Sequence, residues 1–359
     1  MNKIKLGMIG FGFRARGISY NLQKQLNRYD VVAICDVKKS ALDEAKKMWG
    51  DNVMLLSSYE KLLEIDEIEA VIIAIPQFAH KEAVISSFSA NKHVYCEKPM
   101  AITVSACNEM IKARDKAGKI FIIGQQMRYH MHLQKMSQLI KGNEIGRPIM
   151  AWLKEFRNPF PETMLWVFDK KKSGGMLTDK NCHHFDVFNW FIGSRPIRVF
   201  ASGAADVYPE IFGIKSNVAD NAWVIVEYEN GSRAMLGICM FAGLPYKYEA
   251  GIGMHMREIG VAGDKGILRT EGFDLGTTVE LKYADSRNVT RYDFSDEGNI
   301  PGVFNQNGNQ GIFIDFAECI RTGRTPFASA EIGREALAMS LAGEKSMEEK
   351  RIVEISEIK

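Results

Sequence analysis

Five short, mainly apolar segments in the first 125 residues constrain the fold most strongly. They are residues 3–9, VVAIC (31–35), AVIIAI (70–75), HVYC (93–96) and KIFIIG (119–124). Amphipathic segments separate them, as in Ile18–Leu26, where apolar residues recur at every fourth position. Strands that are apolar without alternation are buried on both faces, which is typical of a parallel sheet covered by helices. We therefore predict a doubly wound α/β domain over residues 1–125.

Local signals delimit several of the intervening helices. Ser57 with Glu60 fits a capping box, Thr103 is placed to cap a later helix, and Gly118 to end it. These signals predict helices shortly after residue 57 and between residues 103 and 118.

The remainder, residues 126–359, has a different pattern and predicts an α+β domain with a large, open, mainly antiparallel sheet. WVIVEYENGSRAMLGICM (223–240) is typical of a hairpin with a two-residue I′ turn at Asn230-Gly231, and residues 258–272 of a second strand pair turning at Asp264–Gly266. Two helices are expected at the end, over residues 312–323 and 330–347, and the last is expected to pack back on the first domain. The boundary near residue 125 is defined only to within several residues.

Composition excludes several classes of function. The 359 residues carry 46 basic and 44 acidic side chains, so no overall charge favours nucleic acid or an anionic membrane. No apolar segment reaches the roughly 18 residues of a spanning helix. The N-terminus lacks the features of a signal peptide, and the six cysteines form no CxxC pair. We expect reduced thiols and a cytoplasmic protein.

A glycine-rich loop follows the first strand and opens a helix. In Gly10-Phe11-Gly12-Phe13-Arg14-Ala15, Gly10 would make the tight turn and Gly12 would let phosphates approach the backbone. We predict a dinucleotide site that includes Gly10, Gly12, Phe13 and Arg14. The alternative is an ordinary glycine turn.

Asp36 ends the second strand, where a carboxylate can accept hydrogen bonds from an adenosine ribose. A 2′-phosphate would meet a like charge there, which favours NAD. Lys38 and Lys39 keep NADP as the alternative, because either could offset that charge.

A helix over GGMLTDKNCHHFDVFNWFIG (174–193) would carry Asp179, His183 and Asp186 on one face, because they are spaced by four and three residues. An imidazole that titrates near neutral pH can accept a proton from an alcohol. By itself such a pair favours a structural role, and the glycine-rich loop and Glu97-Lys98-Pro99 elsewhere in the chain reverse that preference. Two groups of possible metal ligands lack a recognised ligand spacing, so we predict no metal site. They are Cys182, His183, His184 and Asp186, and His130 with His132.

GMIGFGFRARG, HVYCEKPMAIT and GGMLTDKNCHHFD together resemble the glucose–fructose oxidoreductase / inositol dehydrogenase (Gfo/Idh/MocA) family. The resemblance covers most of the chain and implies a Rossmann domain followed by an open-sheet domain. That sheet often forms homodimers or homotetramers. It implies an enzyme that oxidises or reduces a sugar, cyclitol or sugar derivative with a nicotinamide cofactor.

The resemblance also implies roles for individual residues. Lys98, in Glu97-Lys98-Pro99, matches a lysine that contacts both substrate and nicotinamide. Asp179 and His183 match the catalytic pair. The remaining matches are cofactor contacts at Glu97, Ile75, Pro76 and His80, a basic substrate contact at Arg128 and an aromatic residue at the pocket edge, Trp166.

The chain departs from the family pattern at Asn181, Val167, Cys182 and His184, so the resemblance does not identify the substrate. The resemblance predicts an NAD(P)-dependent dehydrogenase acting on CH–OH groups. Two alternatives are an NAD-dependent glycosidase that acts by transient oxidation and a regulator that binds nucleotide and sugar without catalysis. The sequence does not define the physiological direction, the choice of NAD over NADP, or dimer against tetramer.

Overall fold

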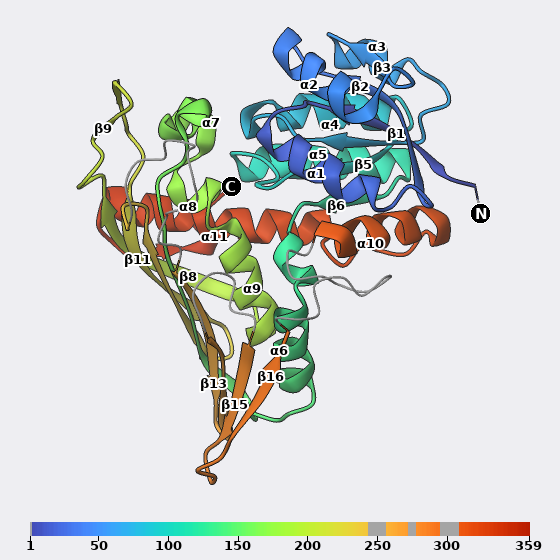
Figure 1. Ribbon diagram of the computed structural model, residues 1–359. Helices are drawn as coiled ribbons and strands as arrows, with labels where there is room; N and C mark the ends of the chain where they lie inside the picture. The colour runs from blue at the N-terminus through green and yellow to red at the C-terminus, as the bar shows by residue number, and fades with distance from the viewer. Residues whose placement is uncertain (1, 243–255, 272–277, 295–308) are drawn as a thin grey trace. The chain divides into compact units, whose positions relative to one another are not determined.

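The computed structural model describes residues 2–242, 256–271, 278–294 and 309–359 (Figure 1). The chain forms two compact units. The first comprises residues 1–129 with 301–334, and the second comprises residues 130–300 with 335–359. Residues 309–334 thus belong with the N-terminal part of the chain. The domain boundary near residue 125 stays a prediction.

The first unit contains a six-stranded sheet in the order β3-β2-β1-β4-β5-β6, with every pair parallel. Its strands are β1 (Ile4–Ile9), β2 (Tyr29–Cys35), β3 (Met54–Leu56), β4 (Ala70–Ile73), β5 (His93–Cys96) and β6 (Phe121–Ile123). The predicted doubly wound parallel sheet is confirmed. The edge strand β3 was not predicted, because three residues give too short a pattern to recognise.

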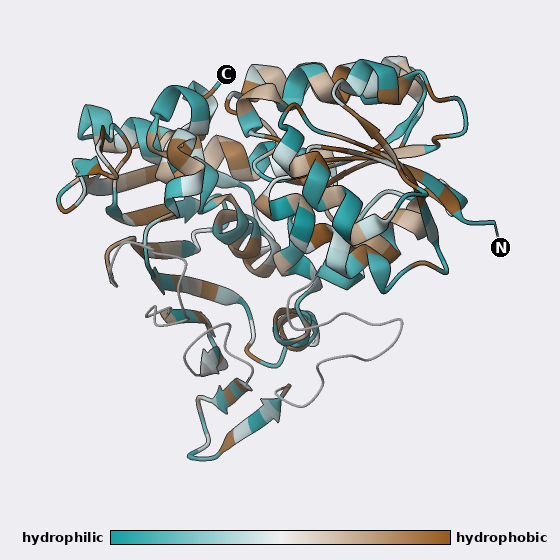
Figure 2. Cartoon of the chain, turned by 45° about the horizontal axis from the view of Figure 1, so that its top comes forward, coloured by the Kyte–Doolittle hydropathy of each residue, from teal (hydrophilic) through white to brown (hydrophobic). Residues whose placement is uncertain are grey.

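Helices cover both faces of this sheet. They are α1 (Phe13–Gln23), α2 (Lys39–Trp49), α3 (Tyr59–Leu63), α4 (His80–Ser89), α5 (Val104–Ala117) and α10 (Asn309–Thr322). On one face, residues of α1 and α10 form a core with Ile4, Leu6 and Met8 of β1. On the other, Gly7 of β1 lies against Leu62 of α3. In Figure 2 the strands of this sheet are largely hydrophobic, whereas the helices carry both kinds of residue.

The helix signals are confirmed in part. Thr103 caps α5 through Ala106 N–H, and Gly118 ends it in a left-handed conformation. The cap of α3 is Ser58, which accepts from Lys61 N–H, so the assignment to Ser57 was wrong by one residue.

The second unit is built on a nine-stranded sheet in the order β16-β15-β14-β13-β7-β12-β11-β8-β17. Only β7 and β12 pair in parallel, so the predicted, mainly antiparallel sheet is confirmed. The strands are β7 (Pro148–Phe156), β8 (Pro196–Ala204), β11 (Asn221–Tyr228), β12 (Arg233–Cys239), β13 (Met256–Gly263), β14 (Gly266–Glu271), β15 (Thr278–Tyr283), β16 (Val289–Asp293) and β17 (Val353–Glu354). A separate pair joins β9 (Glu210–Ile211) to β10 (Ile214–Lys215).

Both predicted hairpins form, with one correction. Glu229, Asn230 and Gly231 connect β11 to β12, and Tyr228 N–H donates to Ser232 O at 3.0 Å. Gly231 has a φ of +81°, but Asn230 is not among the residues with positive φ. A I′ turn needs positive φ at both central residues, so the two-residue turn was wrong.

The second unit also holds α6 (Met131–Lys141), the 3₁₀ segment η3 (Glu162–Phe168), α7 (Lys170–Ser173), α8 (Met176–Asp179) and α9 (Cys182–Ile192). The helix α11 (Ala330–Glu349) begins in the first unit and continues into the second. The two expected closing helices are therefore confirmed as α10 and α11.

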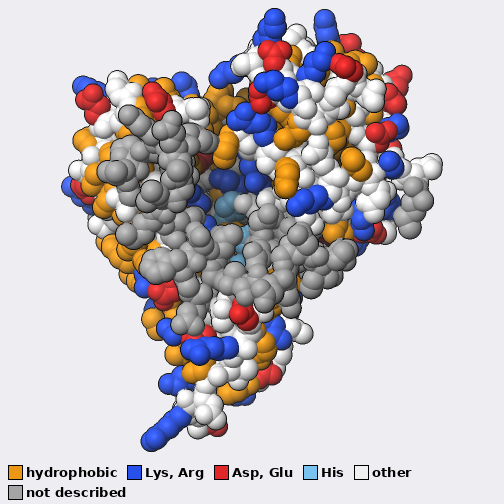
Figure 3. All heavy atoms as spheres, in the orientation of Figure 1, with side chains coloured by type: hydrophobic (Ala, Val, Ile, Leu, Met, Phe, Trp, Pro, Cys, Tyr) orange, Lys and Arg blue, Asp and Glu red, His pale blue; other side chains and the backbone are white. Residues whose placement is uncertain are grey.

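Basic and acidic side chains are interspersed on the face shown in Figure 3. All six cysteines lie within the described residues and are free thiols. Across the described ranges, no helix combines the length and apolar character needed to cross a bilayer.

Candidate functional site

The loop between β1 and α1 leaves room at the carboxyl end of the sheet. Gly10 has a φ of +91°, and a Cβ there would lie 2.6 Å from Ala74 O. At Gly12, the N-cap of α1, a Cβ would meet no atom within 4 Å. Gly10 therefore permits close approach of two strand ends, whereas Gly12 faces open space at a helix N-terminus that has no side-chain cap. Such a terminus favours a bound anion.

Asp36 stabilises this loop from the end of β2. Its two carboxylate oxygens accept N–H groups of Phe11 at 2.7 Å and Lys38 at 2.8 Å. An ionised carboxylate has further lone pairs on both oxygens, so it retains acceptor capacity for a ribose hydroxyl. Lys38 and Lys39 are exposed beside it.

His80 joins the segments that follow β4 and β5. Its Nε2 lies 2.9 Å from Ile75 O, and its Nδ1 lies 3.0 Å from Pro99 O. The side chain is 1% exposed, and burial lowers the pKa of His80. Its described contacts therefore hold Ile75 and Pro99 in place. A direct contact of His80 with the cofactor stays a prediction, as do those of Ile75 and Pro76.

Glu97 is a buried carboxylate immediately before Lys98. Its Oε1 accepts the hydroxyl of Tyr95 at 2.6 Å and lies 2.9 Å from Arg14 Nε. Burial is the largest single effect on Arg14 and lowers its pKa, but the charges and hydrogen bonds of Glu97 and Tyr95 together raise that pKa overall. Gly124 lies against the same carboxylate, because a Cβ there would lie 3.0 Å from it. The backbone next to Lys98 is therefore fixed by contacts from three elements, β5, α1 and the segment after β6.

These features fit a dinucleotide. The order of the sheet places its topological switch point between β1 and β4, where ligands of open α/β sheets bind. The carboxyl ends of β1, β4, β2 and β5 are followed by Gly10, Pro76, Asp36 and Lys98, respectively. Gly12 and the start of α1 are suited to a pyrophosphate, Asp36 to a ribose. Phe13, beside them, is 57% exposed.

Arg128 and Trp166, the two predicted substrate contacts, lie in different units. Arg128 is 6% exposed in the first unit, with its guanidinium 5.1 Å from the centre of the Phe327 ring. Trp166 belongs to η3 in the second unit and packs on a small cluster around Val167 and Phe168. Their roles toward a substrate stay predictions.

The expected helix over residues 174–193 is two helices. The i to i−4 hydrogen bonds of α8 end with Asn181 N–H to Leu177 O, and those of α9 begin at Asn181 O. Asp179 is the last residue of α8, and His183 the second of α9. The side chains are 4% and 5% exposed, so the structure places an acid and an imidazole, both buried, on either side of the break.

A buried carboxylate, Glu155 of β7, contacts residues on both sides of the break. It lies 3.0 Å from Lys180 Nζ and 2.9 Å from His184 Nε2, and the Asn181 amide donates to His184 Nδ1 at 2.8 Å. Arg257 of β13 also contacts Glu155, at 3.0 Å. The residues next to Asp179 and His183 are thus bound to the sheet, which fixes both catalytic candidates.

Sequence reasoning missed this cluster. Along β7, Ala151, Leu153 and Glu155 are buried in alternation. Glu155 thus occupies an inward position of a half-buried strand, and an acid there usually has a cationic partner. That alternation was the available signal. The identity of the partners depended on tertiary contacts.

The second of the two glycines before α8 makes room for a second buried acid. At Gly175, with a φ of +102°, a Cβ would lie 2.2 Å from the Glu344 carboxylate. That carboxylate accepts Leu177 N–H at 2.8 Å and pairs with Lys170 at 3.0 Å. Glu344 of α11 therefore caps the helix that carries Asp179.

Within the described ranges, no group of three or more His, Cys, Asp or Glu side chains is arranged to hold a metal ion. His130 and His132 lie side by side, with ring centres 5.4 Å apart.

Comparison with known proteins gives two matches to family models. Residues 4–125 match "Oxidoreductase family, NAD-binding Rossmann fold", and residues 137–355 match "Oxidoreductase family, C-terminal alpha/beta domain". Among curated relatives, the chain is 27% identical to myo-inositol 2-dehydrogenase of Thermotoga maritima over 99% of both chains. It is 24% identical to inositol 2-dehydrogenase of Salmonella typhimurium over 68% of this chain and 69% of that one.

Solved structures show the same fold. A probable dehydrogenase from Thermotoga maritima has a TM-score of 0.79 at 25% identity, covering 99% of this chain and 100% of that one. An oxidoreductase domain protein from Kribbella flavida has a TM-score of 0.86 at 22% identity, with the same coverage. The WlbA dehydrogenase from Bordetella pertussis, solved with NADH and UDP-GlcNAcA, has a TM-score of 0.79 at 22% identity, covering 98% and 99%.

Proposed function

Because the chain belongs to the Gfo/Idh/MocA oxidoreductase family, we propose that it interconverts a hydroxyl group and a ketone on a sugar, cyclitol or related polyol. It is a dehydrogenase with an NAD-binding Rossmann domain. The proposal concerns the substrate and the residues that act on it. Support for a polyol comes from the inositol dehydrogenases among its relatives.

Bound NAD supplies the redox chemistry by accepting or donating a hydride at its nicotinamide ring. The pyrophosphate end would be held by Gly10, Gly12, Phe13 and Arg14, and the adenosine ribose by Asp36. Ile75, Pro76, His80 and Glu97 would line or shape the nicotinamide end. The negative charge of Asp36 would repel the 2′-phosphate of NADP, which favours NAD. Parallel assays with both cofactors test this preference.

The observation that carries the proposed chemistry is the position of Lys98. It follows β5 at the carboxyl edge of the sheet, next to a carboxylate fixed by Tyr95 and Arg14. In the oxidation direction, the ammonium would stabilise the negative charge that develops on the substrate oxygen. His183 would accept the hydroxyl proton, and Asp179 would orient His183 or bond to the same substrate. Arg128 and Trp166 would contact the rest of the substrate.

The decisive experiment replaces Lys98 by Met. The side chain stays unbranched, is one atom shorter and loses its charge, so NAD binding should persist while kcat falls by about a hundredfold or more. Turnover is followed at the NADH absorbance on a panel of sugars, cyclitols and keto-sugars, and NAD binding by quenching of protein fluorescence. Wild-type turnover in this variant would refute the assignment of Lys98.

The same panel separates the alternatives. Cleavage of glycosides without net NADH formation would favour a glycosidase that acts by transient oxidation. NAD binding without turnover of any substrate would favour a regulator.

The outward face of the sheet in the second unit favours association with a second copy of the chain. Four outward-facing residues form a row across neighbouring strands: Phe200 pairs with Ile225, Ile225 with Met235, and Met235 with Trp152. Phe200, Ile225 and Met235 are 42%, 45% and 39% exposed. An apolar row of this kind is typical of an interface. We expect a homodimer or homotetramer in the cytoplasm.

A further inference from the structure

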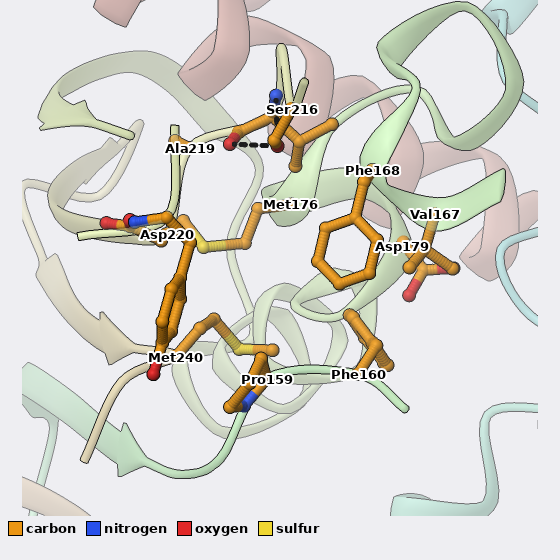
Figure 4. Close-up of a pocket in the computed structure, with 12 residues that line it drawn as sticks. Pro159, Phe160, Val167, Phe168, Met176, Asp179, Ser216, Ala219, Asp220 and Met240 are labelled. Atoms are coloured by element: carbon orange, nitrogen blue, oxygen red, sulfur yellow. Dashed lines mark hydrogen bonds between the residues drawn. The ribbon is translucent and has the colours of Figure 1, made fainter. Parts of the chain in front are cut away.

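A small pocket in the second unit adjoins Asp179 (Figure 4). Its walls come from the segment after β7, from η3 and α8, from the loops between β8 and β11, and from the end of β12. Asp179 lies at one end beside Val167. The pocket is therefore next to a residue of the proposed catalytic set.

The walls are mainly apolar. Phe160, Phe168, Met176, Val218 and Met240 supply aromatic rings, thioethers and a branched aliphatic side chain. An alcohol or a charged group of a substrate would lose hydration against these side chains without gaining hydrogen bonds.

Two polar side chains in the wall, Asp220 and Ser216, are already bonded within the protein. Asp220 accepts N–H groups of Val207 at 2.8 Å and Tyr208 at 2.7 Å, and the amide of Asn221 at 2.9 Å. The hydroxyl of Ser216 donates to Val218 O at 3.2 Å. These bonds order the loop and leave the pocket with an apolar character.

The free space in the pocket is small. The volume that the centre of a water-sized group can occupy is about 20 Å³. This is slightly more than one water molecule needs. A sugar ring does not fit in such a volume. A methyl group does, with the adjustment that the flexible side chains of Met176 and Met240 allow.

We propose that this pocket is a subsite for one methyl group of the substrate, adjoining the carbon on which the enzyme acts. The substrate is then a methyl-bearing polyol, with the methyl either on carbon, as in a deoxy sugar, or on oxygen, as in a methyl glycoside or ether. The inference rests on the proposed function, because it takes Asp179 as a residue that faces the substrate.

Matched pairs of substrates test the proposal: a hexose against its 6-deoxy analogue, and a hexose against its methyl glycoside. The 6-deoxy sugar carries a methyl group where the hexose has a hydroxymethyl, and the glycoside adds a methyl group to the anomeric oxygen. Burial of that methyl group in an apolar pocket raises kcat/KM by about tenfold. We expect this preference in one of the two pairs, and the pair that shows it identifies the source of the methyl group. If both parent sugars are turned over and neither methyl-bearing member is preferred, the subsite is refuted and the proposed function stands. If no member is turned over but a cyclitol of the substrate panel is, the subsite is refuted and the proposed function stands; if nothing on the panel is turned over, both fail.

Val218→Phe tests the location. A phenyl ring fills the free space, so the ratio of kcat/KM between the members of the preferred pair should fall to about one, from the tenfold expected above. Val207→Phe is the matched control, because Val207 lies in the preceding loop, is 46% exposed and does not line the pocket; its ratio should equal that of the wild type. Circular dichroism spectra and thermal unfolding like those of the wild type establish that both variants are folded. A ratio unchanged by Val218→Phe refutes the subsite. Should that variant not fold, the wild-type ratios of the matched pairs decide the proposal.

Discussion

At the scale of single residues, Glu155 is the most informative side chain outside the proposed catalytic set. It is fully buried and contacts three cations, Lys180, Arg257 and, at 3.9 Å, Arg157, as well as His184. One carboxylate thus faces three positive charges within the second unit. Because Lys180 and His184 each adjoin a catalytic candidate, the charge of Glu155 affects both stability and the position of those candidates.

Glu155→Gln should destabilise the protein by about 3–5 kcal/mol, because it leaves buried cations facing an uncharged amide. Thermal unfolding followed by circular dichroism measures the loss. Glu258→Gln is the control: Glu258 pairs with Lys154 at 2.6 Å, and both side chains are about one third exposed. The control should lose about 1 kcal/mol or less. Equal losses in the two variants would contradict the assigned role of Glu155.

His184 should remain neutral in the folded protein down to acid pH. Burial lowers its pKa to about 4, although Glu155 acts in the opposite direction. The neutral ring also suits its contacts, since Nδ1 accepts from Asn181 while Nε2–H faces Glu155. Lys180 and Arg257 add positive charge nearby.

The pKa of an unfolded histidine is about 6.5, so the unfolded chain takes up a proton first as the pH falls. Stability should therefore decrease between pH 6.5 and pH 4, and the contribution of His184 amounts to about 3 kcal/mol. Titration by NMR, with the His184 signal identified from its loss in His184→Gln, measures the pKa directly. A midpoint near 6.5 would contradict this prediction.

At the scale of elements, the start of α8 depends on a glycine for two separate reasons. Gly175 has a positive φ, and it also leaves the space that Glu344 occupies. Gly193, which ends α9, has a φ of +65° but no atom within 4 Å of a Cβ. A side chain at Gly193 would therefore cost only the unfavourable backbone conformation. A side chain at Gly175 would cost that and, in addition, a steric clash with Glu344.

Gly193→Ala should cost about 1–2 kcal/mol, the usual penalty for a side chain in the left-handed region. Gly175→Ala should cost more, because the methyl group displaces Glu344 from Leu177 N–H, and it should also reduce kcat. Denaturant unfolding and steady-state turnover measure the two effects. Similar stability and activity in the two variants would show that Glu344 does not position α8.

At the scale of the whole molecule, the outward face of the nine-stranded sheet governs the proposed assembly. Ile225→Asp places a charge in the middle of the apolar row and should shift the protein toward monomer. Val224 is the neighbouring residue on the inward face and is fully buried, so it offers no test of the surface. Arg198→Asp is a better control, because Arg198 is exposed on the same face beyond the row and pairs with Glu227.

Light scattering after size-exclusion chromatography gives the mass of each variant. The wild type and Arg198→Asp should be dimers or tetramers, whereas Ile225→Asp should have the mass of one chain. A monomeric wild type would refute the assembly, and an unchanged mass for Ile225→Asp would place the interface elsewhere.

The sequence by itself determined both fold classes, the parallel strands with their helices, and the loop that begins at Gly10. These features depend on local physics: periodicity sets which faces are buried, and a positive φ next to a strand end requires glycine. It did not determine the edge strand β3, the three-residue turn at Glu229–Gly231, or the break between α8 and α9. Glu155 contacts the residues at the break and Glu344 caps the start of α8, and these acids lie 24 residues before and 165 after Asp179 in the sequence. Only the tertiary structure brings such acids to the backbone of one helix, because their contacts follow from how the sheet and α11 pack rather than from any neighbouring residue.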